Sequence, residues 1–319
     1  MAELMRAVVA QQTGDADVLA VDEVDKPTPG PGEVLIRNHA AGINPVDWKT
    51  RRGGGVAGQV GEPPWILGWD VAGVVEAVGP DVAQFATGDA VFGMVRFPEL
   101  GRAYAEHVAA PAEHLASKPA SISAVEAAAL PLVALTAWQA LFDHAGLQPG
   151  ATVLIHAAAG GVGHVAVQLA KWKDARVIGT SSRHADFLRS LGVDEVIDYT
   201  STDFAEAVDD VDVVIDPIGG DTLVRSLDVL VPEGVLVRLS SLSDEERQLA
   251  DERGVRATGM LVEPDGEQLA RIAALVDEGV LEPRVQATYR LDEAPDAHRV
   301  SEDGHVCGKL VLHVPGPRR

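Results

Sequence analysis

The chain has 319 residues, of which 46% are hydrophobic and 23% are charged, a composition typical of a folded globular protein. Its length exceeds what one hydrophobic core usually spans, so two domains are expected. Acidic side chains number 48 against 26 basic ones, and the formal charge of -22 disfavours nucleic acid and anionic membrane surfaces as partners.

The start of the chain lacks the basic stretch and the apolar run of an export signal, and no apolar run reaches membrane-spanning length. We therefore expect a cytoplasmic protein. The one cysteine, Cys307, excludes a disulfide within the chain and any metal site that needs two thiolates.

Short apolar runs separated by turn signals characterise the first third of the chain. Residues 34–36 and 71–75 are such runs, and turn signals separate them: proline and glycine at 29–32 and 79–80, and Gly88-Asp89. This texture predicts a β-rich domain over residues 1–124, shaped as a partly open barrel.

The texture changes after about residue 123. Residues 127–141 are rich in alanine and leucine and are expected to form a helix, with Pro131 near its start. Strand-like and helix-like segments then alternate, with strands expected at 152–156, 175–180, 195–197, 211–215 and 235–239, and helices at 161–172 and 185–191. Apolar strands separated by helices predict a buried, doubly wound parallel sheet of the Rossmann type over residues 125–262.

The last segment, residues 263–319, is expected to return to the first domain. Residues 267–278 have a helical pattern, and residues 309–314 are expected to form a strand of that domain.

A glycine-rich turn follows the strand at 152–156 and opens the helix at 161–172. Such a turn lets backbone N–H groups approach a dinucleotide pyrophosphate, and the start of the helix adds partial positive charge. Relative to the pattern G-x-G-x-x-G, Ala158 replaces the first glycine, and Gly160 and Gly163 hold the other places. We expect the cofactor to lie on Ala158, Ala159, Gly160, Gly161, Val162 and Gly163.

The residues that determine specificity for NADH or NADPH come at the end of the next strand. Proteins that bind NAD usually place an acidic residue there, but this chain has Ser181, Ser182 and Arg183. A guanidinium with small hydroxyl groups can bind a 2′-phosphate, which a carboxylate would repel. NADPH is therefore the favoured cofactor, although an exposed arginine at a helix start could also be merely solvated.

The chain resembles the zinc-independent quinone oxidoreductase branch of the medium-chain dehydrogenase/reductase superfamily. The similarity rests on the order and spacing of several short segments, at residues 32–36, 42–47, 68–75, 78–79, 88–93, 128–131, 136–137, 157–163, 198–199 and 308–312. It implies a GroES-like first domain, a Rossmann cofactor domain and a homodimer that extends the cofactor sheet through residues 256–262.

Zinc relatives in this superfamily hold their catalytic metal with a cysteine within the segment that here is 42–47 and a histidine within 68–70. Asn44 and Trp69 occupy those neighbourhoods here. Their structural zinc needs four cysteines, which this chain lacks. We therefore expect no metal. His39, His107 and His114 are scattered and are expected to be surface or packing residues.

The resemblance also implies roles for individual residues. Asn44 is expected beside the nicotinamide and the substrate, with Asp47 and Trp48 in the same site and Thr136 near the nicotinamide. Tyr199 is expected beside the adenosine phosphate, and Ser240 and Lys309 complete the expected cofactor contacts. Tyr199 could equally be a plain strand-end aromatic and Thr136 a helical hydroxyl bonded to its own backbone.

The loop after Asp47 departs from the family, because several members carry an active-site tyrosine there and this chain does not. Trp48 could stack on a flat ring or simply pack in the interior. Lys49, Arg51 and Arg52 could attract an anionic substrate, although solvated cations are the ordinary outcome on such a loop.

Without a Lewis acid, quinones and other conjugated carbonyls are the expected hydride acceptors, because their negative charge is delocalised as it develops. The leading hypothesis is an NADPH-dependent quinone reductase. The alternatives are an enone or enoyl double-bond reductase, which could be a tailoring enzyme of secondary metabolism, and an NADPH-binding regulatory or structural protein without turnover.

Overall fold

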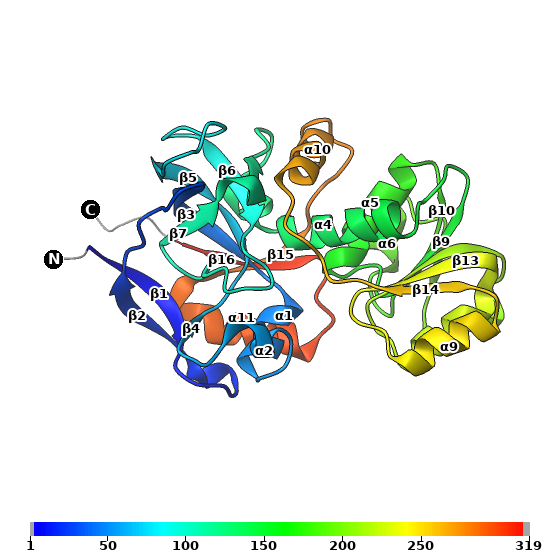
Figure 1. The fold of residues 1–319 in the computed structure, drawn as a ribbon. Helices are drawn as coiled ribbons and strands as arrows, with labels where there is room; N and C mark the ends of the chain where they lie inside the picture. The colour runs from blue at the N-terminus through cyan, green and yellow to red at the C-terminus, as the bar shows by residue number, and fades with distance from the viewer. Residues whose placement is uncertain (1–2, 315–319) are drawn as a thin grey trace. The chain divides into compact units, whose positions relative to one another are not determined.

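A computed structural model of the chain describes residues 3–314 (Figure 1). Contacts divide the chain into two units, one made of residues 1–135 and 263–319 and the other of residues 136–262. The division at 135/136 falls later than the expected boundary at 124/125. The reason is that helix α3 (Ala124–Ala128) packs on strands β3 (Glu33–Ile43) and β5 (Asp70–Val78) of the first unit.

The first unit contains two sheets of mainly antiparallel strands. The larger one has the order β15-β16-β3-β5-β6-β8, with β7 also paired to β3, and the smaller one has the order β2-β1-β4. The remaining strands of this unit are β1 (Leu4–Ala10), β2 (Leu19–Asp25), β4 (Trp65–Ile66), β6 (Ala90–Met94), β7 (His107–Pro111), β8 (Leu115–Ser117), β15 (Val285–Arg290) and β16 (Lys309–His313). The strand expected at 309–314 is therefore present, and it lies inside the larger sheet between β15 and β3.

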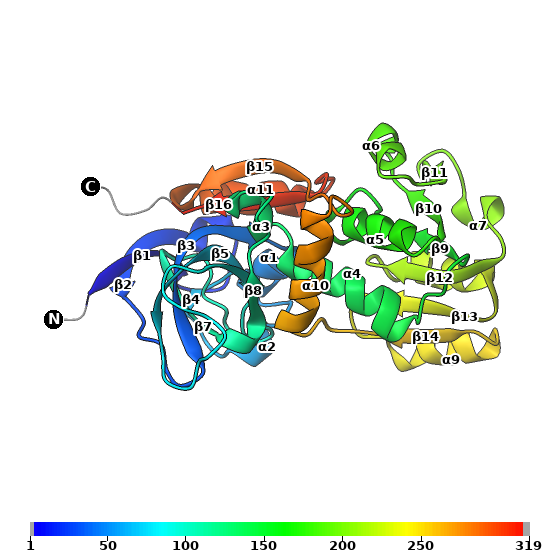
Figure 2. The ribbon, with the colours of Figure 1, turned by 90° about the horizontal axis from the view of Figure 1, so that it is seen from above.

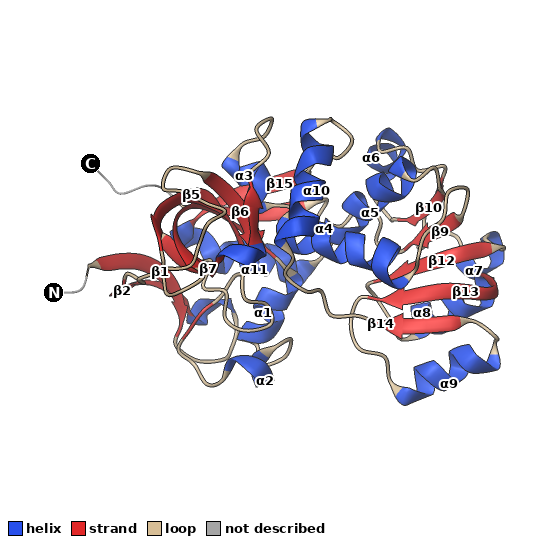
Figure 3. Cartoon of the chain, turned by 45° about the horizontal axis from the view of Figure 1, so that its top comes forward, coloured by secondary structure: helices blue, strands red, loops and turns tan. Residues whose placement is uncertain are grey.

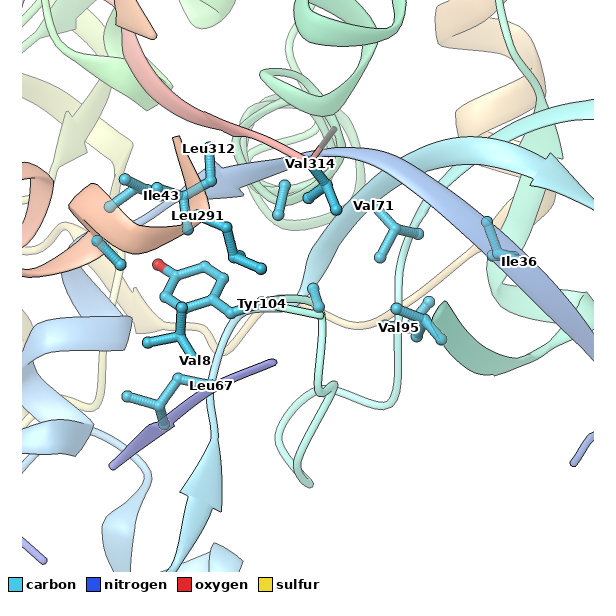
Figure 4. Packing of buried hydrophobic residues seen from close by; sticks show 14 of the residues in the cluster. Val8, Ile36, Ile43, Leu67, Val71, Val95, Tyr104, Leu291, Leu312 and Val314 are labelled. Carbon is cyan, nitrogen blue, oxygen red and sulfur yellow. The ribbon is translucent and has the colours of Figure 1, made fainter. Parts of the chain in front are cut away.

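Short and medium helices accompany these sheets (Figure 2). Besides α3 they are α1 (Pro45–Arg51), α2 (Ala57–Val60), α10 (Gly266–Asp277) and α11 (Ala294–Asp303), with single 3₁₀ turns at Ala16–Val18, Ala112–His114 and Leu291–Glu293. Figure 4 shows the apolar core of the unit, in which Tyr104 lies among Val8, Leu67 and Leu291.

The second unit is a six-stranded, fully parallel sheet in the order β11-β10-β9-β12-β13-β14. Its strands are β9 (Thr152–Ile155), β10 (Arg176–Thr180), β11 (Glu195–Ile197), β12 (Val211–Asp216), β13 (Leu230–Arg238) and β14 (Arg256–Gly259). This order reverses direction between β9 and β12, which is the Rossmann arrangement, and dinucleotides bind at the carboxyl ends of the strands at such a reversal.

Helices and turns connect these strands (Figure 3). They are α5 (Gly161–Trp172), α6 (Ala185–Ser190), α7 (Phe204–Ala207), α8 (Asp221–Ser226) with a 3₁₀ turn at Leu227–Val229, and α9 (Asp244–Glu252). Helix α5 packs on β9 and β10, and α9 packs on β14. The predicted doubly wound sheet is thereby confirmed.

The single helix expected at 127–141 is wrong. The structure breaks it into α3, α4 (Pro131–Trp138) and a π-helical turn, Gln139–His144. Pro131 is the first residue of α4 and not part of a longer helix, because proline has no N–H to donate and disfavours helical backbone in the residue before it. Nowhere in residues 3–314 is there a helix whose length and apolarity would let it span a bilayer.

Candidate active site

Asn44 and Asp47 lie at the junction between β3 and α1. Pro45 begins the helix, where its fixed backbone and missing N–H suit the first position, and Asn44 precedes it with extended backbone. The carboxylate Oδ2 of Asp47 accepts the backbone N–H of Asn44 at 2.5 Å, and the N–H of Asp47 donates to the carbonyl of Asn44 at 3.0 Å. These reciprocal bonds fix the two residues relative to each other.

The Asn44 side chain is held from two sides. Its Nδ2 donates to Oδ2 of Asp70 at 2.8 Å, and its Oδ1 accepts from Nζ of Lys309. The same ammonium donates to the Ile43 carbonyl at 2.6 Å and lies 3.6 Å from Oδ2 of Asp70. Strand register brings the three residues together, because Gly42 pairs with Asp70 and Ile43 pairs with Leu310.

All of these polar groups are removed from water. Asn44, Asp47 and Asp70 are 0% exposed and Lys309 is 3% exposed. Burial raises the pKa of Asp47 to about 7, although the Asn44 N–H, the Lys309 charge and the Tyr104 hydroxyl oppose the rise. Burial also raises the pKa of Asp70 and lowers that of Lys309, and the attraction between the two offsets part of both shifts. One buried ammonium thus faces two buried carboxyl groups.

The rest of the α1 segment differs from the expected cationic loop. Arg51 is fully buried, donates to the Gly14 carbonyl at 3.0 Å and forms an ion pair with Glu302. Arg52 also pairs with Glu302, at 2.7 Å. The expectation of solvated cations is therefore wrong for Arg51. Because this segment is the helix α1 and not a loop, the Arg51 side chain is directed into the interior.

Trp48 is half-buried on α1, and within residues 3–314 its buried Nε1 has no hydrogen-bond partner. The ammonium of Lys49, which is exposed, lies 5.6 Å from the centre of the Trp48 ring. A half-buried indole fits stacking on a flat ligand as well as simple packing.

The glycine turn of the second unit has the geometry that a pyrophosphate needs. Ala157 has a positive φ of 49°, and its N–H donates to Oγ1 of Thr180 at 3.2 Å. A Cβ at Gly163 would lie 2.4 Å from the Ala157 carbonyl oxygen, so that only glycine lets the helix pack this closely on the turn. The first N–H groups of α5 have no partner inside the helix and are available to an anion.

The predicted phosphate-binding residues gather after β10 and β11. The Ser182 hydroxyl lies 3.1 Å from the Tyr199 hydroxyl, and Tyr199 is 48% exposed. Arg183 is exposed beside them, and it forms no ion pair within the part of the chain that the structure describes. The nearby carboxylate of Asp198 is bonded to Thr200 in its own turn. A phosphate at this place would therefore meet hydroxyl groups and a guanidinium.

The expected site residues fall into two groups. Asn44, Asp47, Trp48 and also Lys309 lie in the first unit, and the remaining predicted cofactor residues lie in the second, with Ser240 two residues after β13. Thr136 lies on α4 and is 6% exposed. Lys309 thus belongs to the same unit as Asn44 and contacts it there.

Sequence reasoning missed three polar residues of the first group. Asp70 interrupts a buried run of residues, a signal that could have identified it. Tyr104 and His298 carry no such signal, because their contacts join residues 57 and 194 positions apart.

The donors around Asn44 do not suit a zinc ion. Trp69 is 0% exposed, packs edge-on against Phe97 and donates its Nε1–H to the Glu99 carbonyl at 2.6 Å, so it offers no ligand atom. Asn44 supplies an amide whose oxygen already accepts from an ammonium. Zinc prefers thiolate and imidazole ligands, and within residues 3–314 no cluster of three or more metal-binding side chains occurs.

Known proteins resemble the chain over nearly its whole length. It is 37% identical to a 2-haloacrylate reductase of Burkholderia sp, covering 97% of this chain and 99% of the relative. It is 35% identical to the chloroplastic quinone-oxidoreductase QR1 of Triphysaria versicolor, covering 97% and 98%. The solved quinone oxidoreductase of Coxiella burnetii has 39% identity and a TM-score of 0.94, covering 98% of this chain and 100% of that one.

Family models agree with these relatives. One described as "Alcohol dehydrogenase GroES-like domain" matches residues 30–120, and one described as "Zinc-binding dehydrogenase" matches residues 191–312. The parallel cofactor-type sheet, the separate β-rich unit and the similarity to named reductases give one conclusion. The chain is an oxidoreductase that belongs to the medium-chain dehydrogenase/reductase superfamily, in its quinone oxidoreductase-like branch.

Proposed function

We propose that this oxidoreductase uses NADPH to reduce a quinone or a related conjugated carbonyl. The observation that supports the cofactor is the phosphate-binding group formed by Ser181, Ser182, Arg183 and Tyr199, four residues that offer a guanidinium and hydroxyl groups and include no carboxylate. A 2′-phosphate gains charge-assisted hydrogen bonds from such a group. A 2′-hydroxyl carries no charge and gains less from the guanidinium.

The bound dinucleotide supplies the hydride in this scheme. Residues of the chain bind and orient it: the N–H groups at Gly161, Val162 and Gly163 face the pyrophosphate, and Thr136 and Asn44 serve the nicotinamide end. Lys309 and Asp70 fix the orientation of the Asn44 amide. Negative charge develops on the substrate when it accepts the hydride. Because hydrogen bonds are the means of stabilising this charge, we expect a substrate that delocalises it.

Two substrate classes have support from relatives. The quinone oxidoreductases of Triphysaria and Coxiella favour a quinone, which is the substrate we propose. The reductase named for 2-haloacrylate favours the second candidate, a carbon–carbon double bond conjugated to a carbonyl or carboxylate group. Both classes accept hydride at a conjugated carbon, so the same arrangement of residues serves either.

Steady-state oxidation of NADPH by the purified chain tests the proposal. Acceptors should include benzoquinones, naphthoquinones, enones, enals and a 2-haloacrylate, each with NADPH and with NADH. We expect turnover with NADPH and a higher kcat/KM for quinones than for the other acceptors. Preference for the haloacrylate or the enones would establish the second candidate, and binding of NADPH without any turnover would indicate a regulatory protein.

Replacement of Arg183 by alanine tests the cofactor assignment. Loss of a charge-assisted bond should raise the Kd of NADPH about tenfold to a hundredfold and leave that of NADH unchanged. Arg189→Ala is the matched control, because Arg189 lies on helix α6, which begins two residues after Arg183, is exposed and pairs with Asp186. Equal losses for NADPH and NADH in Arg183→Ala would contradict the assignment.

We also propose that the chain forms a homodimer through β14. This strand lies at the edge of the parallel sheet and pairs with β13 alone, so its outer backbone groups can accept another strand. Light scattering at several concentrations should give twice the mass of 33.5 kDa. A monomer at all concentrations would contradict this proposal.

A further inference from the structure

A line of buried hydrogen bonds leads away from Asp47 through residues that neither the cofactor nor the substrate touches in the proposed function. The Tyr104 hydroxyl donates to Oδ2 of Asp47 at 3.0 Å and lies 3.2 Å from Nε2 of His298. Nδ1 of His298 lies 3.2 Å from Nη1 of Arg51, whose Nη2 forms the ion pair with Glu302. Tyr104, His298 and Arg51 are 0% exposed.

The chemistry of these side chains fixes which atom donates in each hydrogen bond of the line. Arginine has only donors, so Nδ1 of His298 must accept from Arg51. Burial and the Arg51 charge lower the pKa of His298 to about 3, so the ring is neutral and carries its one proton on Nε2. That N–H donates to the Tyr104 oxygen, and the single Tyr104 hydrogen is then directed at Asp47.

We propose that Tyr104 and His298 are positioning residues that hold Asp47, and through it the Asn44 backbone, in the geometry that the proposed reduction requires. The inference rests on the proposed function for its effect on turnover. The role is to position Asp47 and not to conduct protons. Nδ1 of His298 accepts from the Arg51 guanidinium, so it cannot take up a proton from that side.

Packing alone does not account for the tyrosine. The Tyr104 ring lies in the apolar core among Val8, Leu67 and Leu291, a place that phenylalanine would fill equally well (Figure 4). Only the hydroxyl reaches Asp47 and His298. Tyr104→Phe therefore removes the hydrogen bond and keeps the packing.

The charged and titratable groups around Asp47 come from four directions. Lys309 faces it from β16, Asp70 from β5 and Tyr104 from the segment before β7, while His298 on α11 stands behind Tyr104. The Tyr104 hydroxyl stabilises the ionised form of Asp47, and Asp70 and burial oppose it. Losing the hydroxyl should therefore favour the protonated carboxyl.

Infrared difference spectra recorded between low and high pH measure this effect without any substrate. The band of the protonated Asp47 carboxyl is identified by its disappearance in Asp47→Asn. We expect its titration midpoint to rise by about one pH unit in Tyr104→Phe, the value of one hydrogen bond. Tyr289→Phe is the matched control, because it removes a half-buried hydroxyl of the same unit that is outside the line.

His298 is tested by two replacements. Glutamine has both a donor and an acceptor and should keep the midpoint near that of the unchanged chain. Leucine has neither and should shift it in the same direction as Tyr104→Phe. The double variant Tyr104→Phe, His298→Leu should behave like Tyr104→Phe alone, because the histidine acts only through the tyrosine.

Kinetics then connect the line to the reaction. In Tyr104→Phe we expect kcat to fall about tenfold, the KM for NADPH to stay constant, and the midpoint of the kcat–pH profile to move with the infrared midpoint. An unchanged infrared midpoint in Tyr104→Phe would overturn the inference, and so would a shifted midpoint with kcat and its pH profile unchanged. If the unchanged chain binds NADPH but turns over no acceptor, the proposed function fails, and the infrared result still decides whether Tyr104 and His298 hold Asp47.

Discussion

The region around Asn44 and the region around the glycine turn differ in whether their polar groups are buried and paired or exposed and available. Around Asn44, buried side chains of both charges bind one another, although Oδ1 of Asp47 and Nε1 of Trp48 have no hydrogen-bond partner within residues 3–314. The second unit differs, because its polar groups are available to a ligand. They are the backbone N–H groups of the glycine turn, the exposed Arg183 and the half-exposed Tyr199. The first arrangement is that of a scaffold that fixes a geometry, and the second is that of a surface that receives an anion.

Removal of the Lys309 charge should lower the stability of the first region more than any other change. Lys309→Met keeps the length of the side chain and leaves Asp47 and Asp70 buried without their cation. We expect a loss of roughly 3 to 5 kcal/mol in the free energy of unfolding, measured by urea denaturation. The exposed Lys49→Met should change it by less than about 0.5 kcal/mol. The double variant Lys309→Met, Asp70→Asn should recover part of the loss, and failure to recover any would contradict the buried pair.

The ionisation of Asp47 should make the first region sensitive to pH. Its pKa is raised from the ordinary 3.8 to about 7, so the folded chain holds a proton that the unfolded chain releases. Between these values stability falls as pH rises, by about 1.4 kcal/mol per pH unit, and it is constant above and below them. Asp47→Asn should abolish this contribution. Unfolding of both chains from pH 3.5 to 8 should give a difference that grows by roughly 4 kcal/mol across the window, and a constant difference would refute the raised pKa.

Close packing of helix α5 on the glycine turn should matter for both stability and cofactor binding in the second region. In Gly163→Ala the new Cβ would press on the Ala157 carbonyl, at a cost of about 1 to 3 kcal/mol and a weakening of NADPH binding by about tenfold. Gly58→Ala is the control, because no atom lies within 4 Å of a Cβ at that position. Calorimetric titration with NADPH decides, and unchanged affinity in Gly163→Ala would mean that the cofactor does not rest on this turn.

The exposed hydroxyl groups of the second region should have the smallest effect. Tyr199→Phe removes one partner of the Ser182 hydroxyl at the surface, so stability should change by less than about 0.5 kcal/mol. The Kd of NADPH should rise about threefold, as for one exposed hydrogen bond, and that of NADH should not change. A loss as large as that of Arg183→Ala would show that the tyrosine does more than support the phosphate.

The same contrast explains what the sequence could predict. Strands and helices of the second unit follow local patterns, so α5 and β11 match their expected bounds, and the parallel sheet follows from the alternation of strands and helices. The single helix expected over residues 127–141 is wrong because Pro131 disfavours helical backbone in the residue before it. In the first unit, Asn44 and Asp47 could be singled out, but the inward turn of Arg51 and the joining of Tyr104 to His298 depend on contacts between distant parts of the chain.

The place of β16 has a consequence for synthesis of the protein on the ribosome. This strand lies inside the larger sheet, between β15 and β3, although it is made near the end of the chain. Residues 136–262 form a complete sheet of their own and can fold as soon as they emerge. Residues 40–43 of β3 must wait unpaired on one side until residue 313 is available, whereas residues 33–37 already pair with β7. Exposed strand edges of this kind are where a nascent chain aggregates or needs a chaperone.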